Sequence, residues 1–300
     1  MNRSYMSQAE QNGNRTSQGR GWRTAWPFVV PFLLFYGLFL IYPAIQVGLL
    51  SLTDSDLAGR GRFIGFSNYL ELAGDRDFWK SVWHTLYFII LTVVPNTVAG
   101  FFFALLVGRL HRLRLAVLSA FFLPYVLPVS VVTTTALWIL DANFGIVNYI
   151  FNSQTAWFGD PAFAMPGVAL VTIWWTVGFN VLLFIAGLQN IPKDLYEASA
   201  LDGANALQRV LFITCPLIWP VTRLALLLQL ILQFKIFDQV YLLTRGGPYN
   251  STIVVLFYMY SEAFQLNRGG YGAAIAVVLV VIILVVSAVQ FRLLNVGRSK

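Results

Sequence analysis

The stretch GLQNIPKDLYEASALDGANALQRVLFITCPLIWP, residues 187–220, is the long polar interruption in the second half of a sequence made mostly of apolar runs. Pro192 suits the first turn of a helix, because the N–H that proline lacks is not needed there. Asp194 complements the positive end of the helix dipole. Gly203 is placed to end this short helix, since glycine accepts the left-handed backbone conformation common just past a helix C-terminus.

A second helical segment is expected after this glycine. It runs from about residue 204 to residue 213, and Pro216 and Pro220 are expected to interrupt it. The sequence thus predicts a bent pair of short helices between two apolar runs of membrane length. The pattern alone leaves open whether this pair is a plain helical loop or a functional element.

Composition places the protein in a membrane. Hydrophobic residues make up 58% of the 300-residue chain and charged residues 11%, with a mean hydropathy of +0.69, whereas soluble domains average about 25% charged residues. We therefore expect an all-α integral membrane protein. The net charge of +7 is spread over loops and tails, which argues against a nucleic-acid partner. Cys215 is the single cysteine, which excludes an intramolecular disulfide and a thiolate metal cluster.

Six apolar runs are long enough to cross a hydrocarbon core of about 30 Å. Residues 1–21, which precede them, are polar and are expected to be a disordered cytoplasmic tail. The first run is too long for a signal-peptide core and has no cleavage site after it, so it is expected to remain as a span. The predicted membrane domain covers residues 22–296, and residues 297–300 form a cytoplasmic tail. Its spans are about 26–52, 83–108, 115–140, 166–189, 217–243 and 271–291, with a loop at 190–220.

The distribution of Lys and Arg predicts the orientation. With the N-terminus inside, 13 of these 20 residues fall on inner segments, including the cluster RLHRLR at 109–114, and 6 fall on outer ones. The acidic residues agree, with 4 inside and 8 outside. Both termini and the loop at 190–220 are therefore predicted to be cytoplasmic.

Polar groups at membrane depth are costly, which makes them candidates for a functional role. In the fifth span only 11 uncharged residues separate Arg223 from Lys235, too few to cross a membrane, so this helix either carries Lys235 at membrane depth or starts earlier, near Leu217. Lys235 and Asp238 stand three apart, so on one helix they share a face and can pair. They either line a translocation cavity or form an ion pair at the outer membrane boundary. Four amide side chains in the spans face either a polar pathway or a neighbouring helix. They are Asn96, Asn180, Gln229 and Gln233.

The sequence offers few catalytic groups. The two histidines, His84 and His111, lie at opposite ends of the second span, and neither an HExxH spacing nor a GxSxG elbow occurs. None of the four lysines completes a GxxxxGK phosphate-binding loop. The chain is therefore not expected to be an enzyme, and any ATP that drives it must be bound by a partner.

Residues 197–216 resemble the EAA loop of the inner-membrane permease subunits of bacterial binding-protein-dependent ABC importers. The family pattern runs EAA, two residues, DGA, then a spacer leading to I-x-L-P. Ser199 replaces the second alanine and Cys215 the leucine, and both are small or apolar exchanges. Phe212 stands at a position that is commonly basic. The matching residues are Glu197, Ala198, Asp202, Gly203, Ala204, Ile213 and Pro216.

Further segments resemble the sugar-permease branch of this family, the subgroup similar to maltose and glycerol-phosphate permeases. They cover nearly the whole chain from Pro27 onward. The matching segments are YPAIQVGLLSL from Tyr42, FIGFSNY from Phe63, FFLPYVLP from Phe121, NFGIVN from Asn143, IFDQVYLLTRGGPYNST from Ile236 and GYGAAIAV from Gly270.

The resemblance implies a type I ABC importer-like fold with six transmembrane helices and a cytoplasmic coupling helix. It also implies a non-catalytic permease subunit in the bacterial inner membrane, serving a carbohydrate or related polyol. Its partners would be a second permease subunit, two copies of a cytoplasmic ATPase that bind ATP and Mg, an extracytoplasmic solute-binding protein, and membrane lipid. The residues that would couple the chain to the ATPase are Glu197, Ala198, Ser199, Asp202, Gly203, Ala204 and Pro216.

Three alternatives remain open. One is an anionic substrate, glycerol-phosphate or another sugar derivative, which Arg245 and Lys235 favour and Asp238 opposes. Another is an ion-coupled secondary transporter acting alone, which requires carboxylates in several spans, whereas only Asp238 is a candidate. The third is a structural scaffold, which does not explain the cytoplasmic helix pair.

Overall fold

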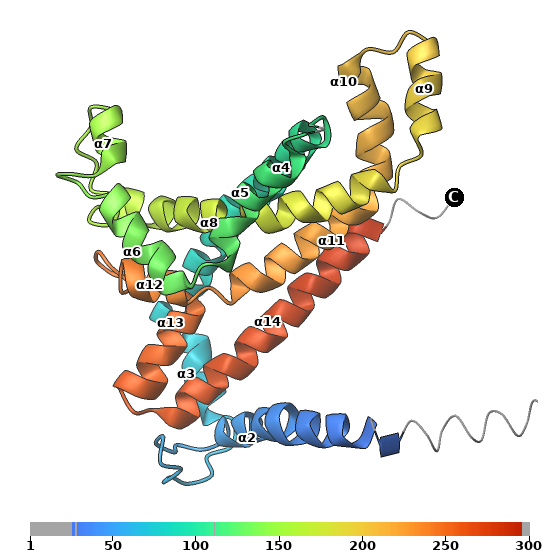
Figure 1. Ribbon diagram of the computed structural model, residues 1–300. Coiled ribbons are helices and arrows are strands. Elements are labelled where there is room, and N and C mark those ends of the chain that lie inside the picture. The colour runs from blue at the N-terminus through green and yellow to red at the C-terminus, as the bar shows by residue number, and fades with distance from the viewer. Residues whose placement is uncertain (1–25, 28, 111, 296–300) are drawn as a thin grey trace, which may run out of the picture.

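The computed structural model describes residues 26–27, 29–110 and 112–295, and within these ranges the chain is helical with no β-strand. Among the described residues, five helices are long and apolar enough to cross a membrane, and a bent pair counted as one span brings the number to six. The all-α class expected from the sequence is thereby confirmed. In Figure 1 the long helices cross one another obliquely, and α9 (Lys193–Leu201) and α10 (Ala206–Arg209) form a hairpin at one end of the molecule.

The helices follow one another along the chain in a simple order, in which η marks a π-helical turn. They are η1 (Gly37–Ile41), α2 (Tyr42–Leu50), α3 (Ser67–Gly74), α4 (Arg76–Gly108), α5 (Arg114–Val126), α6 (Val129–Ile139), α7 (Ile146–Ile150), α8 (Pro161–Gln189), α9 (Lys193–Leu201), α10 (Ala206–Arg209), η2 (Val210–Thr214), α11 (Cys215–Phe234), α12 (Asp238–Leu243), α13 (Val255–Tyr260), η3 (Ser261–Gln265) and α14 (Gly269–Asn295). The first membrane-length helix is Val29–Leu50, which includes η1 and α2.

The helices α4 and α8 form the centre of the fold. Asp75 caps the start of α4, because its carboxylate accepts hydrogen bonds from the backbone N–H groups of Asp77 (2.9 Å) and Phe78 (3.2 Å). Further along α4, a Cβ placed on Gly100 would lie 2.5 Å from the Cβ of Asn180 in α8. The two backbones therefore approach closely at a small residue, as is typical of membrane helices.

The third apolar run, predicted at 115–140, is not one straight helix. It forms α5 and α6, which are bent relative to each other by 100°. Pro128 accounts for the break, because the residue before a proline avoids the helical region. Leu127 is accordingly extended, with ψ 141°. A single span in the sequence thus becomes a sharply bent pair.

The fifth long helix begins earlier and ends sooner than the sequence suggested. Residues 206–234 form one helix of 29 residues, so Pro216 and Pro220 do not interrupt it. The π-helical turn η2 lies immediately before α11 and widens the backbone where Pro216 would otherwise clash with the preceding turn. The helix ends at Phe234 and α12 is a separate short helix, so the predicted span 217–243 is not a single helix.

The helix Val29–Leu50 lies apart from the other long helices (Figure 1), and none of its most apolar 18-residue window is buried. Its C-terminal end is anchored on α14. The N–H of Gly270 donates to the carbonyl of Ser55 at 2.8 Å, and a Cβ on Gly270 would lie 1.9 Å from the carbonyl oxygen of Thr53. Its apolar side chains are therefore available to lipid or to a neighbouring subunit.

A polar network joins the ends of α4, α13 and α14. Tyr258 donates a hydrogen bond of 2.6 Å to the carboxylate of Asp75, and Tyr271 donates to the same oxygen. Burial disfavours the charged form of Asp75, but the hydrogen bonds outweigh it and hold the pKa of this carboxyl below its ordinary value. Arg268 adds an ion pair with Glu262 at 3.0 Å. These contacts fix the ends of the three helices relative to one another.

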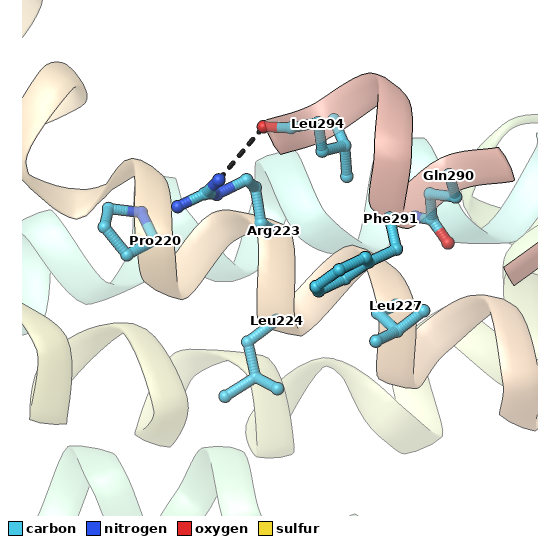
Figure 2. Close-up of a pocket in the computed structure, with 7 residues that line it drawn as sticks. All are labelled: Pro220, Arg223, Leu224, Leu227, Gln290, Phe291 and Leu294. Carbon is cyan, nitrogen blue, oxygen red and sulfur yellow. Dashed lines mark hydrogen bonds between the residues drawn. The ribbon is translucent and has the colours of Figure 1, made fainter. Parts of the chain in front are cut away.

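A second contact fixes α11 to the last turn of α14. Figure 2 shows Arg223 donating a hydrogen bond of 3.0 Å to the carbonyl oxygen of Leu294. The last carbonyls of a helix have no partner within the helix, so this arginine satisfies one of them. The cavity beside it, of about 180 Å³, has a mostly apolar lining and offers a polar ligand few partners. It is lined by Pro220, Arg223, Leu224, Leu227, Gln290, Phe291 and Leu294.

Candidate functional site

The helix α9 is exposed at one end of the molecule, beyond the long helices (Figure 1), and none of its residues is buried. Pro192 lies at the N-cap, one position before the first turn where it was expected, and Asp194 lies in the first turn as predicted. Glu197 and Ala198 are exposed. The helix thus presents a carboxylate and a small residue outward.

The end of α9 is a Schellman motif built on Gly203. This glycine has φ +80°, the left-handed conformation expected from the sequence. Its N–H donates to the carbonyl of Ala200 at 3.2 Å, and the N–H of Ala204 donates to the carbonyl of Ser199 at 2.9 Å. A Cβ on Gly203 would meet nothing within 4 Å. The backbone conformation, and not crowding, therefore requires glycine at this position.

The short helix is held firmly against the long helix that follows it. The hydroxyls of Tyr196 in α9 and Thr214 in η2 share a hydrogen bond of 2.9 Å. Asn205 and Gln208 form a capping box at the start of α10, with hydrogen bonds of 2.9 and 2.7 Å. Pro216 lies within the continuous helix 206–234. The Tyr196–Thr214 hydrogen bond therefore ties α9 to a helix that runs deep into the bundle.

Four of the six predicted pathway residues line one cavity of about 270 Å³. They are Gln229, Gln233, Lys235 and Asp238. The Gln233 amide donates to Oε1 of Gln229 at 3.1 Å, one helical turn away. The cavity is bounded by α5, α8, α11 and α12, and its remaining lining residues are Tyr125, Thr172, Trp175, Thr176, Phe179, Leu232, Ile236 and Gln239.

The residues that α8 contributes to this cavity were missed by the sequence analysis. Thr172, Trp175, Thr176 and Phe179 recur at helical spacing and lie on one face of α8. This spacing was visible within the apolar run 166–189. It did not show which face of the helix meets a cavity and which meets its neighbours, because both faces are apolar and aromatic.

The expected shared helix face of Lys235 and Asp238, on which the ion-pair alternative depended, is wrong. Lys235 is the C-cap of α11 and Asp238 is the first residue of α12, so the two do not share a helix face. In the part of the chain that the structure describes, no ion pair joins them. Both residues are exposed, so each presents its charge separately to the cavity.

Asn96 and Asn180 lie outside the cavity, fully buried between α4 and α8. Asn96 donates a hydrogen bond of 2.7 Å to the hydroxyl of Thr176, which itself lines the cavity. Neither polar atom of the Asn180 amide has a hydrogen-bond partner among the described residues. Asn96 thus supports the cavity wall from behind, whereas Asn180 lies in the α4–α8 contact with no hydrogen-bond partner among the described residues.

Asn180→Leu is expected to raise the stability of the purified protein in detergent by about 1–3 kcal/mol, because a buried amide without a partner costs its desolvation free energy. Thermal unfolding followed by tryptophan fluorescence measures this. The matched control is Asn96→Leu, which removes one unpaired atom, Oδ1, but also breaks the hydrogen bond to Thr176, so its gain in stability should be smaller than that of Asn180→Leu. If Asn180→Leu instead abolished transport without changing stability, Asn180 would belong to the pathway.

The family of the protein follows from comparison with known sequences. Residues 72–295 match the family described as binding-protein-dependent transport system inner membrane component. The chain belongs to this family of ABC transporter permeases.

Several curated relatives match most of the chain. The sulfoquinovosyl glycerol transport system permease SmoG of Agrobacterium fabrum is 31% identical, covering 89% of each chain. The arabinooligosaccharide transport system permease AraP of Bacillus subtilis is 34% identical, covering 89% of this chain and 87% of its own. The trehalose/maltose transport system permease MalF of Thermococcus litoralis is 32% identical, covering 91% and 92%.

Two solved structures share the fold. A bacterial ABC transporter involved in import of the acidic polysaccharide alginate superposes with a TM-score of 0.82 at 22% identity, over 95% of this chain and 99% of that one. The same type of transporter in complex with an alginate pentasaccharide-bound periplasmic protein gives a TM-score of 0.83 at 21% identity, over 95% and 98%. The type I ABC importer-like permease fold expected from the sequence is confirmed.

Proposed function

We propose that this protein is one of two permease subunits of an ATP-driven importer for a carbohydrate or related polyol. The observation that carries the proposal is the helix 206–234, which is tied to α9 at one end and lines the polar cavity at the other. A partner that moves α9 thereby moves a wall of the cavity. We assign Glu197, Ala198, Ser199, Asp202, Gly203, Ala204 and Pro216 to this coupling.

The lining of the cavity suits a polyhydroxyl ligand. Gln229 and Gln233 offer amide donors and acceptors, and the indole N–H of Trp175 has no hydrogen-bond partner among the described residues. The rings of Tyr125 and Phe179 stack at 5.5 Å and add an apolar wall. Binding sites commonly combine such walls with a few placed polar groups. The names of AraP and MalF, which refer to oligosaccharides, support the same substrate class.

A neutral substrate is favoured over an anionic one. Lys235 lines the cavity and attracts an anion, but Asp238 lines it too and opposes this attraction. The names of the relatives and fold neighbours include the acidic polysaccharide alginate and sulfoquinovosyl glycerol as well as oligosaccharides. The charge balance of the cavity therefore supports the neutral class, and an anionic sugar derivative is the second candidate.

The proposed assembly contains a second permease subunit, two copies of a cytoplasmic ATPase that bind ATP and Mg, and an extracytoplasmic solute-binding protein. It lies in the bacterial cytoplasmic membrane, with both termini and α9 on the cytoplasmic side. The excess of Lys and Arg on these segments supports the orientation.

Sugar uptake by the complex reconstituted in liposomes tests this function. Gln233→Leu is expected to lower uptake of a neutral oligosaccharide about tenfold, because it removes one hydrogen-bonding group from the cavity. Gln290→Leu, the same exchange outside this cavity, should leave uptake unchanged. If the complex took up only anionic sugars and Lys235→Gln abolished that uptake, the second candidate would be favoured. Transport by the single chain without ATPase subunits would identify a secondary transporter.

A further inference from the structure

A groove of about 520 Å³ lies between the start of α5 and the end of α8. It shares no lining residue with the polar cavity. Its residues are Arg112, Arg114, Leu115, Leu118, Leu182, Ile185, Ala186 and Gln189. The proposed transport function does not use this groove.

The groove has a polar mouth and an apolar floor. Arg114 is the first residue of α5 and Arg112 lies two residues before it. Gln189 is the last residue of α8, so all three lie at the same end of the two helices. The remaining lining residues are all apolar. Leu118 lies one turn further along α5, and Ile185 lies one turn back along α8. The lining of the groove therefore changes from charged side chains at the mouth to hydrocarbon further in. A phospholipid changes in the same order from its head group to its acyl chains.

Among the residues that the structure describes, Arg112 and Arg114 have no acidic partner. The ion pairs of the described residues involve Arg60, Lys80 and Arg268, and none involves Arg112 or Arg114. The first turn of α5, to which Arg114 belongs, has no side-chain cap, so its N–H groups add to the positive potential. The mouth of the groove thus carries uncompensated positive charge.

We infer that the groove binds one anionic glycerophospholipid of the cytoplasmic leaflet. The guanidinium groups of Arg112 and Arg114 hold the phosphate, since their planar forks match phosphate oxygens. An acyl chain lies along Leu118, Leu182 and Ile185. Basic pockets between membrane helices on the cytoplasmic side are known to take acidic head groups. The cluster 109–114, on the predicted inner side, places the mouth at that leaflet.

Native mass spectrometry of the full-length protein, purified with its importer partners in mild detergent, tests this inference. The probes are phosphatidylglycerol and phosphatidylcholine with identical acyl chains. The wild type is expected to retain one phosphatidylglycerol in preference to phosphatidylcholine. The double variant Arg112→Gln/Arg114→Gln should bind phosphatidylglycerol about 30-fold more weakly, since each basic residue near the surface contributes to acidic-lipid binding.

Two further variants separate charge from shape. Arg60→Gln/Arg62→Gln removes two exposed arginines far along the chain from the groove, and should leave lipid binding unchanged. Ala186→Phe fills the apolar part without altering the charge, because Ala186 lines the groove and is exposed. It is expected to weaken phosphatidylglycerol binding while the protein stays folded.

Three outcomes would overturn the inference. One is equal retention of phosphatidylglycerol by the wild type and the Arg112→Gln/Arg114→Gln variant. Another is displacement of the lipid by inorganic phosphate at equal concentration together with unchanged binding in Ala186→Phe, which would show a phosphate site without a chain site. The third is loss of the ATPase subunits from the double variant with unchanged lipid binding, which would make the arginines a protein contact.

Discussion

Gly178→Ala is expected to prevent the membrane domain from reaching its native packing. A Cβ on Gly178 in α8 would lie 1.9 Å from the carbonyl oxygen of Phe121 in α5, far inside any allowed contact. The obstacle is backbone within a helix, so no side-chain rotation relieves it. Overpacking a well-packed core lowers the free energy of unfolding by about 1–3 kcal/mol. A clash with backbone is expected to cost at least the upper value of this range.

Size-exclusion profiles and thermal unfolding of the protein extracted in detergent measure this effect. Two glycines provide graded controls. Gly187→Ala, also in α8, would meet the side-chain ends of Ile218 and Val221 at 2.6 and 2.7 Å, which can shift, so a smaller loss is expected. Gly48→Ala in α2 meets nothing within 4 Å and should be neutral. A Gly178→Ala protein as stable as Gly48→Ala would show that α5 and α8 can separate without cost.

The long helices were predictable because membrane thickness fixes the length of an apolar run. The breaks in these helices were not predictable, since the effect of a proline depends on the conformation of the backbone turns around it. Pro128 bends the third run by 100° because Leu127 leaves the helical region. Pro216 was expected to end the short helical segment before the fifth span, but the π-helical turn η2 accommodates it within one helix, 206–234. Both prolines lie in apolar sequence, and the difference depends on backbone geometry that composition does not encode.

The candidate site was predictable where local chemistry decides the structure. Gly203 adopts the left-handed conformation that its place after a short helix required. The grouping of Gln229 and Gln233 at one cavity follows from their spacing on one helix. The fate of Asn180 did not follow, because whether a buried amide meets a cavity or a neighbouring helix depends on how α4 crosses α8.

Glu197→Ala is expected to reduce transport and substrate-stimulated ATP hydrolysis at least about tenfold, because it removes a charged hydrogen-bond acceptor from the proposed ATPase contact. Folding and assembly should be unaffected, since Glu197 is exposed and no residue of α9 is buried. Uptake and ATPase rates of the complex reconstituted in liposomes measure both activities. Asp77→Ala, which removes an exposed carboxylate at the start of α4, is the matched control and should retain them.

Gly203→Val is expected to uncouple the complex by a different route, because it changes the direction of α9 instead of its contacts. Valine has ample space there, but φ +80° is strongly disfavoured for a β-branched residue. The last turn of α9 should therefore rearrange, while the long helix 206–234 remains folded. Gly203→Asn tests this reasoning, since asparagine tolerates the left-handed region and should preserve much of the coupling. If Gly203→Val and Glu197→Ala both retained wild-type uptake and substrate-stimulated ATP hydrolysis, α9 would not be the element through which ATP hydrolysis moves this protein.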